Sequence, residues 1–157
     1  NPAGAIYFLM DEQDVRRILA FPYTMIGSDG LPHDRHPHPR LWGTFPRVLG
    51  HYAREVGLFP IEEAIRRMTT LPATRFGLVG RGTLAPGALA DIVVFDPATI
   101  GATALNRVYD QPAGQDRLVS QAIGIQAVIV NGTLIRENGA DVISATDAMP
   151  GQILQGR

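Results

Sequence analysis

The chain has 157 residues, which is enough for one ordinary domain with its own core. Its 45% hydrophobic and 18% charged residues exclude a disordered polymer, and its net charge of −1 gives no electrostatic basis for binding nucleic acid or an anionic membrane. All 14 basic residues are arginines and cysteine is absent, which excludes disulfides and lysine-based chemistry within this chain. No apolar run approaches about 18 residues and no signal-like start is present, so we expect a cytoplasmic protein without a membrane partner.

The first elements predict an α/β arrangement of strand, helix and strand. Residues 5–10 form a short apolar run that is typical of a buried strand. Asp11 can cap a helix that should end around Phe21, because Pro22 disfavours helical geometry in the residue before it. A second strand should follow and end at Asp29, as in a parallel sheet.

The stretch from Thr24 to Gly43 has the most unusual composition in the chain. Asp29 lies between two glycines in the sequence Gly27-Ser28-Asp29-Gly30. The next eleven residues contain three prolines, Arg40 and three histidines (His33, His36 and His38). Proline at this density excludes a helix and stiffens the loop. Titratable side chains on a stiff loop after a strand are typical of an active-site rim, although a solvated surface loop is the alternative interpretation.

Three helices are expected after this loop. The first has Thr44 as its N-cap and can end at Gly57, and the last follows Pro72 and ends at Gly77. His51 lies off the apolar stripe of the first helix and is interpreted as a partly exposed residue. Trp42, just before that helix, is interpreted as a packing residue, with a substrate-pocket wall as the alternative.

The middle helix begins at Pro60. It carries two acid-first i, i+4 pairs, Glu62 with Arg66 and Glu63 with Arg67, which we interpret as a solvated face.

From Val79 onward the pattern changes to short strands. Residues 92–95 read as a strand, with Asp91 and Asp96 in turn or strand-end roles. Residues 97–123 should form a long irregular connection with small strands. Asn131-Gly132 between two β-branched runs predicts a hairpin, because type I′ turns need positive φ at both central residues. The tail after Ile143 is expected to fray.

Three stretches resemble the D-aminoacylases (N-acyl-D-amino-acid deacylases) of the amidohydrolase superfamily. The run GSDGLPHD followed by HPHPRLWGTFPRVLGHYARE is similar to the last barrel segment of that branch. EEAIRRMTTLPATRFGLVGRGTLAPGALADIVVFDP and VIVNGTLIREN resemble the barrel exit and the final hairpin of the small β domain, which dihydroorotases and hydantoinases share.

The resemblance implies the C-terminal end of a (β/α)8 metal-dependent hydrolase barrel followed by part of a small β-sandwich domain. Residues 1–76 would be the last barrel units, 77–145 the partial β domain and 146–157 a tail. Such a barrel needs about 250 residues, and the chain starts Asn1-Pro2 without an initiator methionine. We therefore expect a partner in the missing N-terminal portion of the same enzyme, and no activity from the chain alone.

The resemblance also implies a site. Asp29 would be the general base and then the general acid, and a weak zinc contact; the main ligands of Zn²⁺ would lie outside this chain. Arg40 would bind the α-carboxylate of an N-acyl-D-amino acid, since its planar fork suits a carboxylate; a structural ion pair is the alternative. Gly30 would let the substrate approach the backbone, and His33 would lie near Asp29 in the substrate site.

Two other functions are compatible with the sequence. A cyclic-amide hydrolase of the dihydroorotase or hydantoinase type would share the β-domain motifs without needing Arg40 eleven residues after Asp29. A non-catalytic assembly domain would use the same elements without a working site. His36-Pro37-His38 also has the spacing of a metal pair, but in the family that this chain resembles the corresponding pair lies on the first barrel strand.

Overall fold

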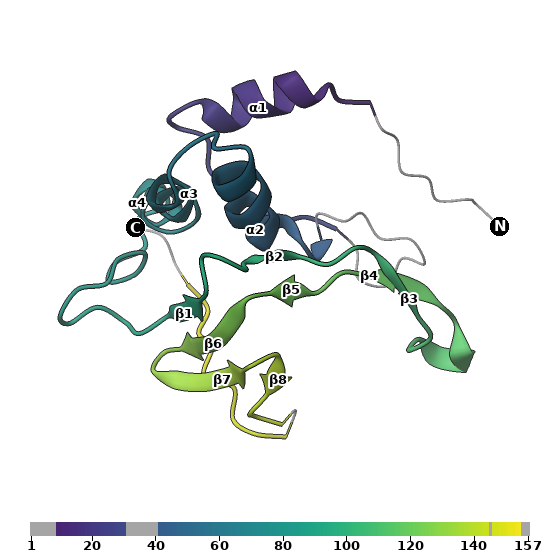
Figure 1. The fold of residues 1–157 in the computed structure, drawn as a ribbon. Helices are drawn as coiled ribbons and strands as arrows, with labels where there is room; N and C mark the ends of the chain where they lie inside the picture. Colours follow the sequence, from purple (N-terminus) through teal and green to yellow (C-terminus); the bar gives the residue numbers. More distant parts are fainter. Residues whose placement is uncertain (1–8, 31–40, 145, 155–157) are drawn as a thin grey trace.

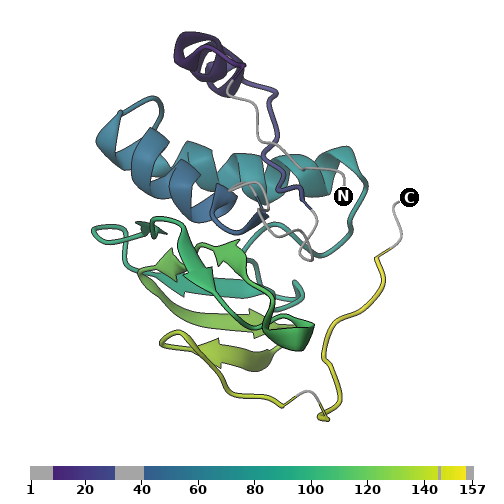
Figure 2. The same ribbon diagram turned by 90° about the vertical axis from the view of Figure 1, so that its right-hand side faces the viewer.

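The computed structural model describes residues 9–30, 41–144 and 146–154. A layer of helices lies over a layer of short strands, and α1 lies at one end, away from the strands (Figures 1 and 2). The described part is therefore mixed α and β, as the sequence predicts. No helix within the described ranges is long and apolar enough to cross a membrane.

Helix α1 spans Glu12–Ala20, as expected from its capping residues. The Asp11 side chain accepts a hydrogen bond from the Gln13 backbone N–H at 2.7 Å, which satisfies one of the free donors of the first turn. Phe21 ends the helix, directly before Pro22. No residue of α1 is fully buried, although Val15 and Leu19 pack against the core.

The second strand predicted before Asp29 is not formed. Residues 24–30 have no helix or strand, and they are held by a few bonds instead: the Thr24 hydroxyl donates to the Ile18 carbonyl at 2.6 Å, and the Ile26 N–H donates to the Arg67 carbonyl at 3.2 Å. A strand exists through ladder hydrogen bonds to a neighbouring strand, and no described strand pairs with this segment. The strand predicted at 5–10 lies mostly outside the described residues.

Helix α2 (Thr44–Arg47) continues directly into the π-helix η2 (Val48–Glu55). Thr44 is the first helical residue, and Gly43 occupies the cap without a side-chain bond. The helix ends as predicted before Gly57, which has a φ of +66°.

Helices α3 (Ile61–Met68) and α4 (Thr70–Arg75) follow, and α3 corrects one interpretation. Glu63 and Arg67 do form the expected i, i+4 pair, at 2.7 Å, but the Arg67 side chain is only 4% exposed. Arg66 also pairs with Glu63, at 2.7 Å, in place of the predicted Glu62. This face is not simply solvated, because α1 and its C-terminal connection pack over Arg67.

The strands of the described ranges form three antiparallel sheets. The largest has the order β1-β6-β7-β8, and the two others pair β2 with β5 and β3 with β4. Their bounds are Ile92–Phe95 for β1, Gly101–Ala102 for β2, Asn106–Val108 for β3, Arg117–Val119 for β4, Ala122–Ile123 for β5, Ile125–Val130 for β6, Thr133–Glu137 for β7 and Ala140–Asp141 for β8. A short 3₁₀ helix, η3 (Pro112–Gly114), lies between β3 and β4.

The predicted hairpin is confirmed. Asn131 and Gly132 have φ values of +46° and +80° between β6 and β7. A second turn of the same kind, Asn138-Gly139, joins β7 to β8 and was missed, although the same dipeptide marks it. Asp91 accepts from the Asn131 N–H and Asp96 from the Ala98 N–H, each at 2.8 Å, which confirms their turn roles.

The helical and strand layers share one core. Its buried members are Val48, Leu49, Tyr52, Ala53, Phe59, Ala64 and Ile100. Ile100, from the connection before β2, is 1% exposed and packs among side chains of η2 and α3. Arg54 of η2 donates to the Ile100 carbonyl at 2.7 Å and to the Pro97 carbonyl at 3.2 Å, so a hydrogen-bonded seam joins the layers.

Candidate functional site

Asp29 lies on the connection between α1 and α2, with its side chain exposed. The connection is anchored three residues earlier, where the Ile26 N–H bonds to Arg67 and the Ile26 side chain packs against the core. Gly30 follows with a φ of +151°. This places a carboxylate at the surface on a backbone that is fixed at its base.

Gly30 and Leu41 bring together the two ends of the loop that the sequence singles out. A Cβ at position 30 would lie only 2.8 Å from the Cβ of Leu41, so only glycine fits there without a shift. His33 and Arg40 fall outside the described residues. Arg40 directly precedes Leu41 in the sequence, and nothing further follows for it from the described residues.

An ion-pair cluster on α3 contacts the start of this connection, with Arg67 buried and Glu63 and Arg66 partly exposed. Glu63 accepts from the Arg66 Nε at 2.7 Å and from the Arg67 Nε at 2.7 Å. The hydrogen bonds from Arg66 and then from Arg67 lower the pKa of Glu63 from 4.5 to about 2, against the opposing effect of burial. The carboxylate is therefore charged at neutral pH. The i, i+4 spacing was visible in the sequence, but the burial of Arg67 depends on how α1 packs.

The described residues do not by themselves form a metal site. No group of three or more His, Cys, Asp or Glu side chains is close enough within them to hold a metal ion. Zinc takes four ligands, or three and a water, and Asp29 can offer one carboxylate. A zinc ion at Asp29 would need the rest of its ligands from elsewhere.

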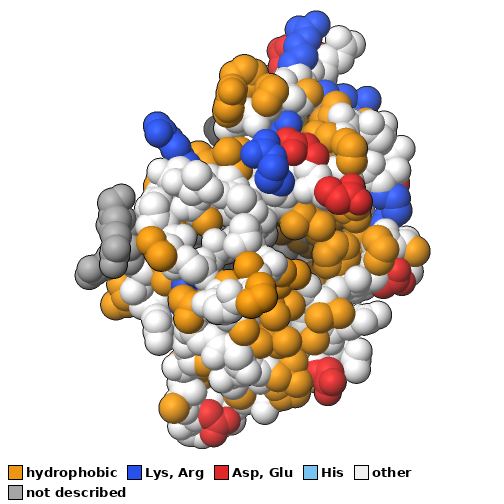
Figure 3. Space-filling model, turned by 90° about the vertical axis from the view of Figure 1, so that its left-hand side faces the viewer, with side chains coloured by type: hydrophobic (Ala, Val, Ile, Leu, Met, Phe, Trp, Pro, Cys, Tyr) orange, Lys and Arg blue, Asp and Glu red, His pale blue; other side chains and the backbone are white. Residues whose placement is uncertain are grey.

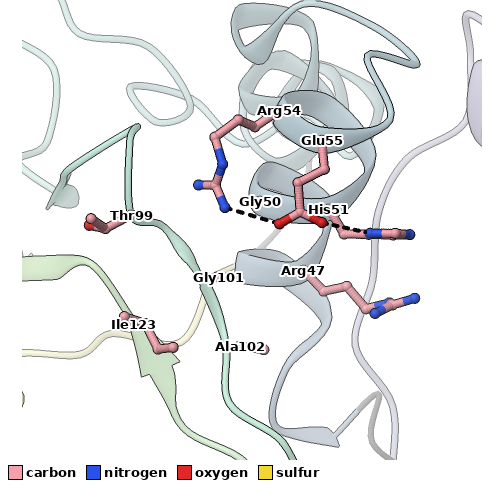
Figure 4. A pocket seen from close by; sticks show the side chains of 9 residues that line it. All are labelled: Arg47, Gly50, His51, Arg54, Glu55, Thr99, Gly101, Ala102 and Ile123. Carbon is pink, nitrogen blue, oxygen red and sulfur yellow. Dashed lines mark hydrogen bonds and ion pairs between the residues drawn. The ribbon is translucent and has the colours of Figure 1, made fainter.

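A small cavity of about 250 Å³ lies between η2 and the β2 region (Figure 4). His51 and Arg54 both contact Glu55, at 3.0 Å and 3.2 Å, and the bond from His51 is the main reason that the pKa of Glu55 is lowered. His51 is 31% exposed at its side chain, which confirms it as a partly exposed helix residue. Glu55 joins His51 to Arg54, and Arg54 bonds to the carbonyls of Pro97 and Ile100, so the cavity lies beside the hydrogen bonds that join the two layers.

Trp42 lines a second, larger groove of about 530 Å³ against the strands. The guanidinium of Arg117 lies 5.3 Å from the centre of its ring, and the buried indole N–H finds no hydrogen-bond partner among the described residues. Trp42 therefore packs against the β layer and walls a groove at the same time.

Comparison with known proteins gives this arrangement a context. The family profile described as "Amidohydrolase family" matches residues 9–152. The D-aminoacylase of Alcaligenes xylosoxydans xylosoxydans is 61% identical over 140 residues, which is 89% of this chain and 27% of that protein.

Two solved structures are similar over most of this chain. One is a D-aminoacylase with a binuclear metal centre. It matches with a TM-score of 0.77 and 52% identity, over 95% of this chain and 29% of that one. The other is the N-acyl-D-glutamate deacylase of Bordetella bronchiseptica with zinc and a phosphonate inhibitor, at a TM-score of 0.78 and 46% identity, over 96% and 29% of the two chains. The chain thus spans less than a third of the length of these relatives.

The family match covers nearly all of the chain, and the fold of the described residues is similar to that of solved members at high sequence identity. The chain belongs to the amidohydrolase family.

Proposed function

We propose that this chain is the C-terminal part of a zinc-dependent deacylase that hydrolyses N-acyl-D-amino acids to a carboxylate and a D-amino acid. The observation that carries the proposal is the 61% identity to a D-aminoacylase over 140 residues. The exposed Asp29 on its anchored connection gives the proposed chemistry a suitable residue.

In the complete enzyme, residues 1–76 would supply the last units of a (β/α)8 barrel, residues 77–145 part of a β-sandwich-like domain and residues 146–157 a tail. The helical and strand layers of the described residues, joined by the Arg54–Ile100 seam, agree with this division. The cytoplasmic location that the sequence favours stays a prediction.

Asp29 is the proposed acid–base residue. Hydrolysis of an amide requires that water lose a proton as it attacks the carbonyl carbon, and that the departing nitrogen gain one. A single exposed carboxylate can take the proton from the attacking water and deliver it to the nitrogen as the C–N bond breaks, so that the nitrogen leaves as a neutral amine. Asp29, on a backbone fixed at Ile26, meets the need for a positioned group.

The substrate carboxylate is assigned to Arg40, and Gly30 and His33 are assigned to the walls of the substrate site. The planar guanidinium of an arginine binds a carboxylate through two parallel hydrogen bonds. The close approach of Gly30 to Leu41 supports the assignment of Arg40, since these two described residues flank the sequence segment that contains it.

Zinc would be held mainly by residues beyond this chain. The described residues contain no metal-binding group of three, so Asp29 is at most one ligand among several. The 157-residue chain alone is accordingly expected to be inactive, and its remaining ligands and barrel strands would come from the N-terminal portion of the same enzyme.

The surface of the chain supports the need for that portion. Hydrophobic side chains gather on the face shown in Figure 3. Large apolar residues are also exposed along the N-terminal segment, where they would be covered in a completed barrel: Leu9, Met10, Ile18, Phe21 and Tyr23.

The test is turnover of N-acetyl-D-methionine and of its L isomer by this chain joined to its N-terminal portion, with zinc present or removed by a chelator. Release of acetate from the D isomer only, lost with the metal and restored by Zn²⁺, is expected. Bound zinc without turnover of either isomer would favour a cyclic-amide hydrolase. Neither turnover nor bound metal would favour a non-catalytic assembly domain.

A further inference from the structure

Arg67 links α3, the end of α1 and the connection that leads to Asp29. Its Nε donates to Glu63 on α3, at 2.7 Å. Its Nη1 donates to the carbonyls of Leu19 and of Phe21, the latter at 2.8 Å, and its Nη2 donates to the carbonyl of Ala20 at 3.4 Å. One side chain thus binds the last carbonyls of α1 and the first carbonyl of the connection that leads to Asp29.

The backbone of Arg67 holds the same connection further along. Its carbonyl accepts the hydrogen bond from the Ile26 N–H at 3.2 Å. The connection is therefore attached to Arg67 at Phe21 by the side chain and at Ile26 by the main chain. Asp29 follows Ile26 by three residues.

The position of Arg67 itself is tightly determined. The residue is 3% exposed, and its guanidinium lies 4.9 Å from the centre of the Phe59 ring in the core. The carbonyls at the end of a helix have no partner within the helix, and a buried cation is costly unless its donors are used. Arg67 gives the carbonyls at the end of α1 their partners and uses its own donors in doing so, with Glu63 as its counter-charge.

We propose that Arg67 is a positioning residue for Asp29, which sets the path of residues 21–30 and thereby the place of the carboxylate. This inference rests on the proposed role of Asp29 in catalysis. Reactions that depend on a fixed acid–base group lose on the order of 100-fold in rate when the group is displaced by about 1 Å. Loss of the Arg67 contacts should therefore lower kcat more than it raises KM.

The experiment uses Arg67→Met and Arg67→Lys in the complete enzyme, with Arg16→Met as the matched control. Arg16 is an arginine on α1 that is 43% exposed and pairs with Glu12, four residues earlier in the same helix, at 3.0 Å. Arg67→Met should lower kcat by about 10- to 100-fold, with KM and zinc content close to the wild type. Arg67→Lys keeps the charge beside Glu63 without the planar fork, so its loss should be smaller and in the same direction.

Hydrogen–deuterium exchange provides a readout that does not depend on activity. Exchange should accelerate in peptides that cover residues 22–30 more than in peptides from α3, because the substitution removes the side-chain bond at Phe21 and leaves only the main-chain bond at Ile26 to hold the connection to Arg67. An equal acceleration throughout the chain would mean general loosening and would overturn the proposal. Unchanged kcat in Arg67→Lys would also overturn it, and this variant decides the question if Arg67→Met does not fold.

Asp29→Asn in the same series separates the two proposals. If Asp29→Asn is inactive and both Arg67 variants turn over normally, only the positioning role fails. If the wild type shows no D-selective turnover, the proposed function fails, and the exchange pattern alone still decides whether Arg67 holds residues 22–30.

Discussion

The carbonyl oxygen of Ile100 occupies the space that a side chain at Gly50 would need. A Cβ built on Gly50 would overlap this oxygen and lie 3.1 Å from the Cα of Gly101. Both obstacles are backbone atoms, which cannot move away as the end of a flexible side chain can. Gly50 therefore allows η2 to approach the chain before β2 closely enough for Arg54 to reach the Ile100 carbonyl.

Gly50→Ala should destabilise the junction of the helical and strand layers. Overpacking of this kind costs about 1–3 kcal/mol, which should lower the Tm. Thermal unfolding of the complete enzyme measures the effect. Gly101→Ala is the control, because a Cβ there has an ordinary 3.8 Å contact with Thr99. Equal Tm values for the two variants would contradict the close approach.

The two Asn-Gly turns allow a matched comparison. Asn131 and Asn138 have nearly the same backbone, with φ values of +46° and +47°, and each precedes a glycine. Only the Asn131 side chain accepts from Arg81, at 2.7 Å, and donates to the Pro150 carbonyl, at 2.5 Å.

Asn131→Ala should therefore lower the free energy of unfolding more than Asn138→Ala, by about 1–3 kcal/mol, since it removes the bond between Asn131 and the largely buried Arg81, which keeps its ion pair with Asp91, and the donor to the Pro150 carbonyl. The backbone cost of alanine at positive φ is common to both variants and cancels in the difference. Chemical denaturation measures both, and equal losses would show that the Asn131 side chain contributes nothing beyond its turn.

The sequence predicted correctly those features of the fold that depend only on neighbouring residues. The cap at Asp11, the end of the helix at Gly57 and the turn at Asn131-Gly132 each depend on a few adjacent residues, and all three are confirmed. The strand before Asp29 failed because a strand needs a partner that no described segment provides. The burial of Arg67 was missed because it depends on carbonyls more than forty positions away in the chain.

The candidate site shows the same limit. Asp29 is predicted as a site residue from its glycine neighbours and the motif around it, and its position relative to other side chains is not part of that prediction. The contact between Gly30 and Leu41 could not be read from the sequence, because ten intervening residues can join two points in many ways. The roles of Arg40 and His33 stay predictions.

Stability should depend on pH through Glu63. Its pKa is lowered from 4.5 in the unfolded chain to about 2 in the folded one by Arg66 and Arg67. The group therefore stabilises the fold fully above about pH 4.5, and this contribution is lost as the pH falls toward 2.

The difference in free energy of unfolding between the wild type and Glu63→Gln should shrink as the pH is lowered through this window. Loss of zinc at low pH affects both proteins and cancels in the comparison. Glu62→Gln, on the exposed side of the same helix, should leave the pH dependence unchanged. A constant difference between wild type and Glu63→Gln would mean that the carboxylate is not held by the two arginines.

Asp29→Asn should abolish most of the turnover of the complete enzyme without unfolding it. The amide cannot take a proton from water, and loss of a general acid–base group typically lowers the rate by about 10²- to 10⁴-fold. The exposed position of Asp29 predicts a Tm close to the wild type. Asp14→Asn, an exposed acid on α1, is the control for loss of a charge. Normal turnover by Asp29→Asn would remove the proposed role.

Arg40→Lys should raise KM for N-acetyl-D-methionine by about tenfold or more with little change in kcat. A lysine keeps the charge but loses the second of two parallel hydrogen bonds, and one charge-assisted bond of about 1.5 kcal/mol corresponds to roughly tenfold in affinity. The control Arg47→Lys, an exposed arginine of α2, should leave KM unchanged. A second substrate makes the test specific: N-acetyl-D-methionine amide, in which a carboxamide replaces the α-carboxylate. The wild type should prefer the carboxylate over this compound, and Arg40→Lys should lose part of that preference. A variant that binds both substrates as the wild type does would leave Arg40 with a structural ion pair in place of a substrate contact.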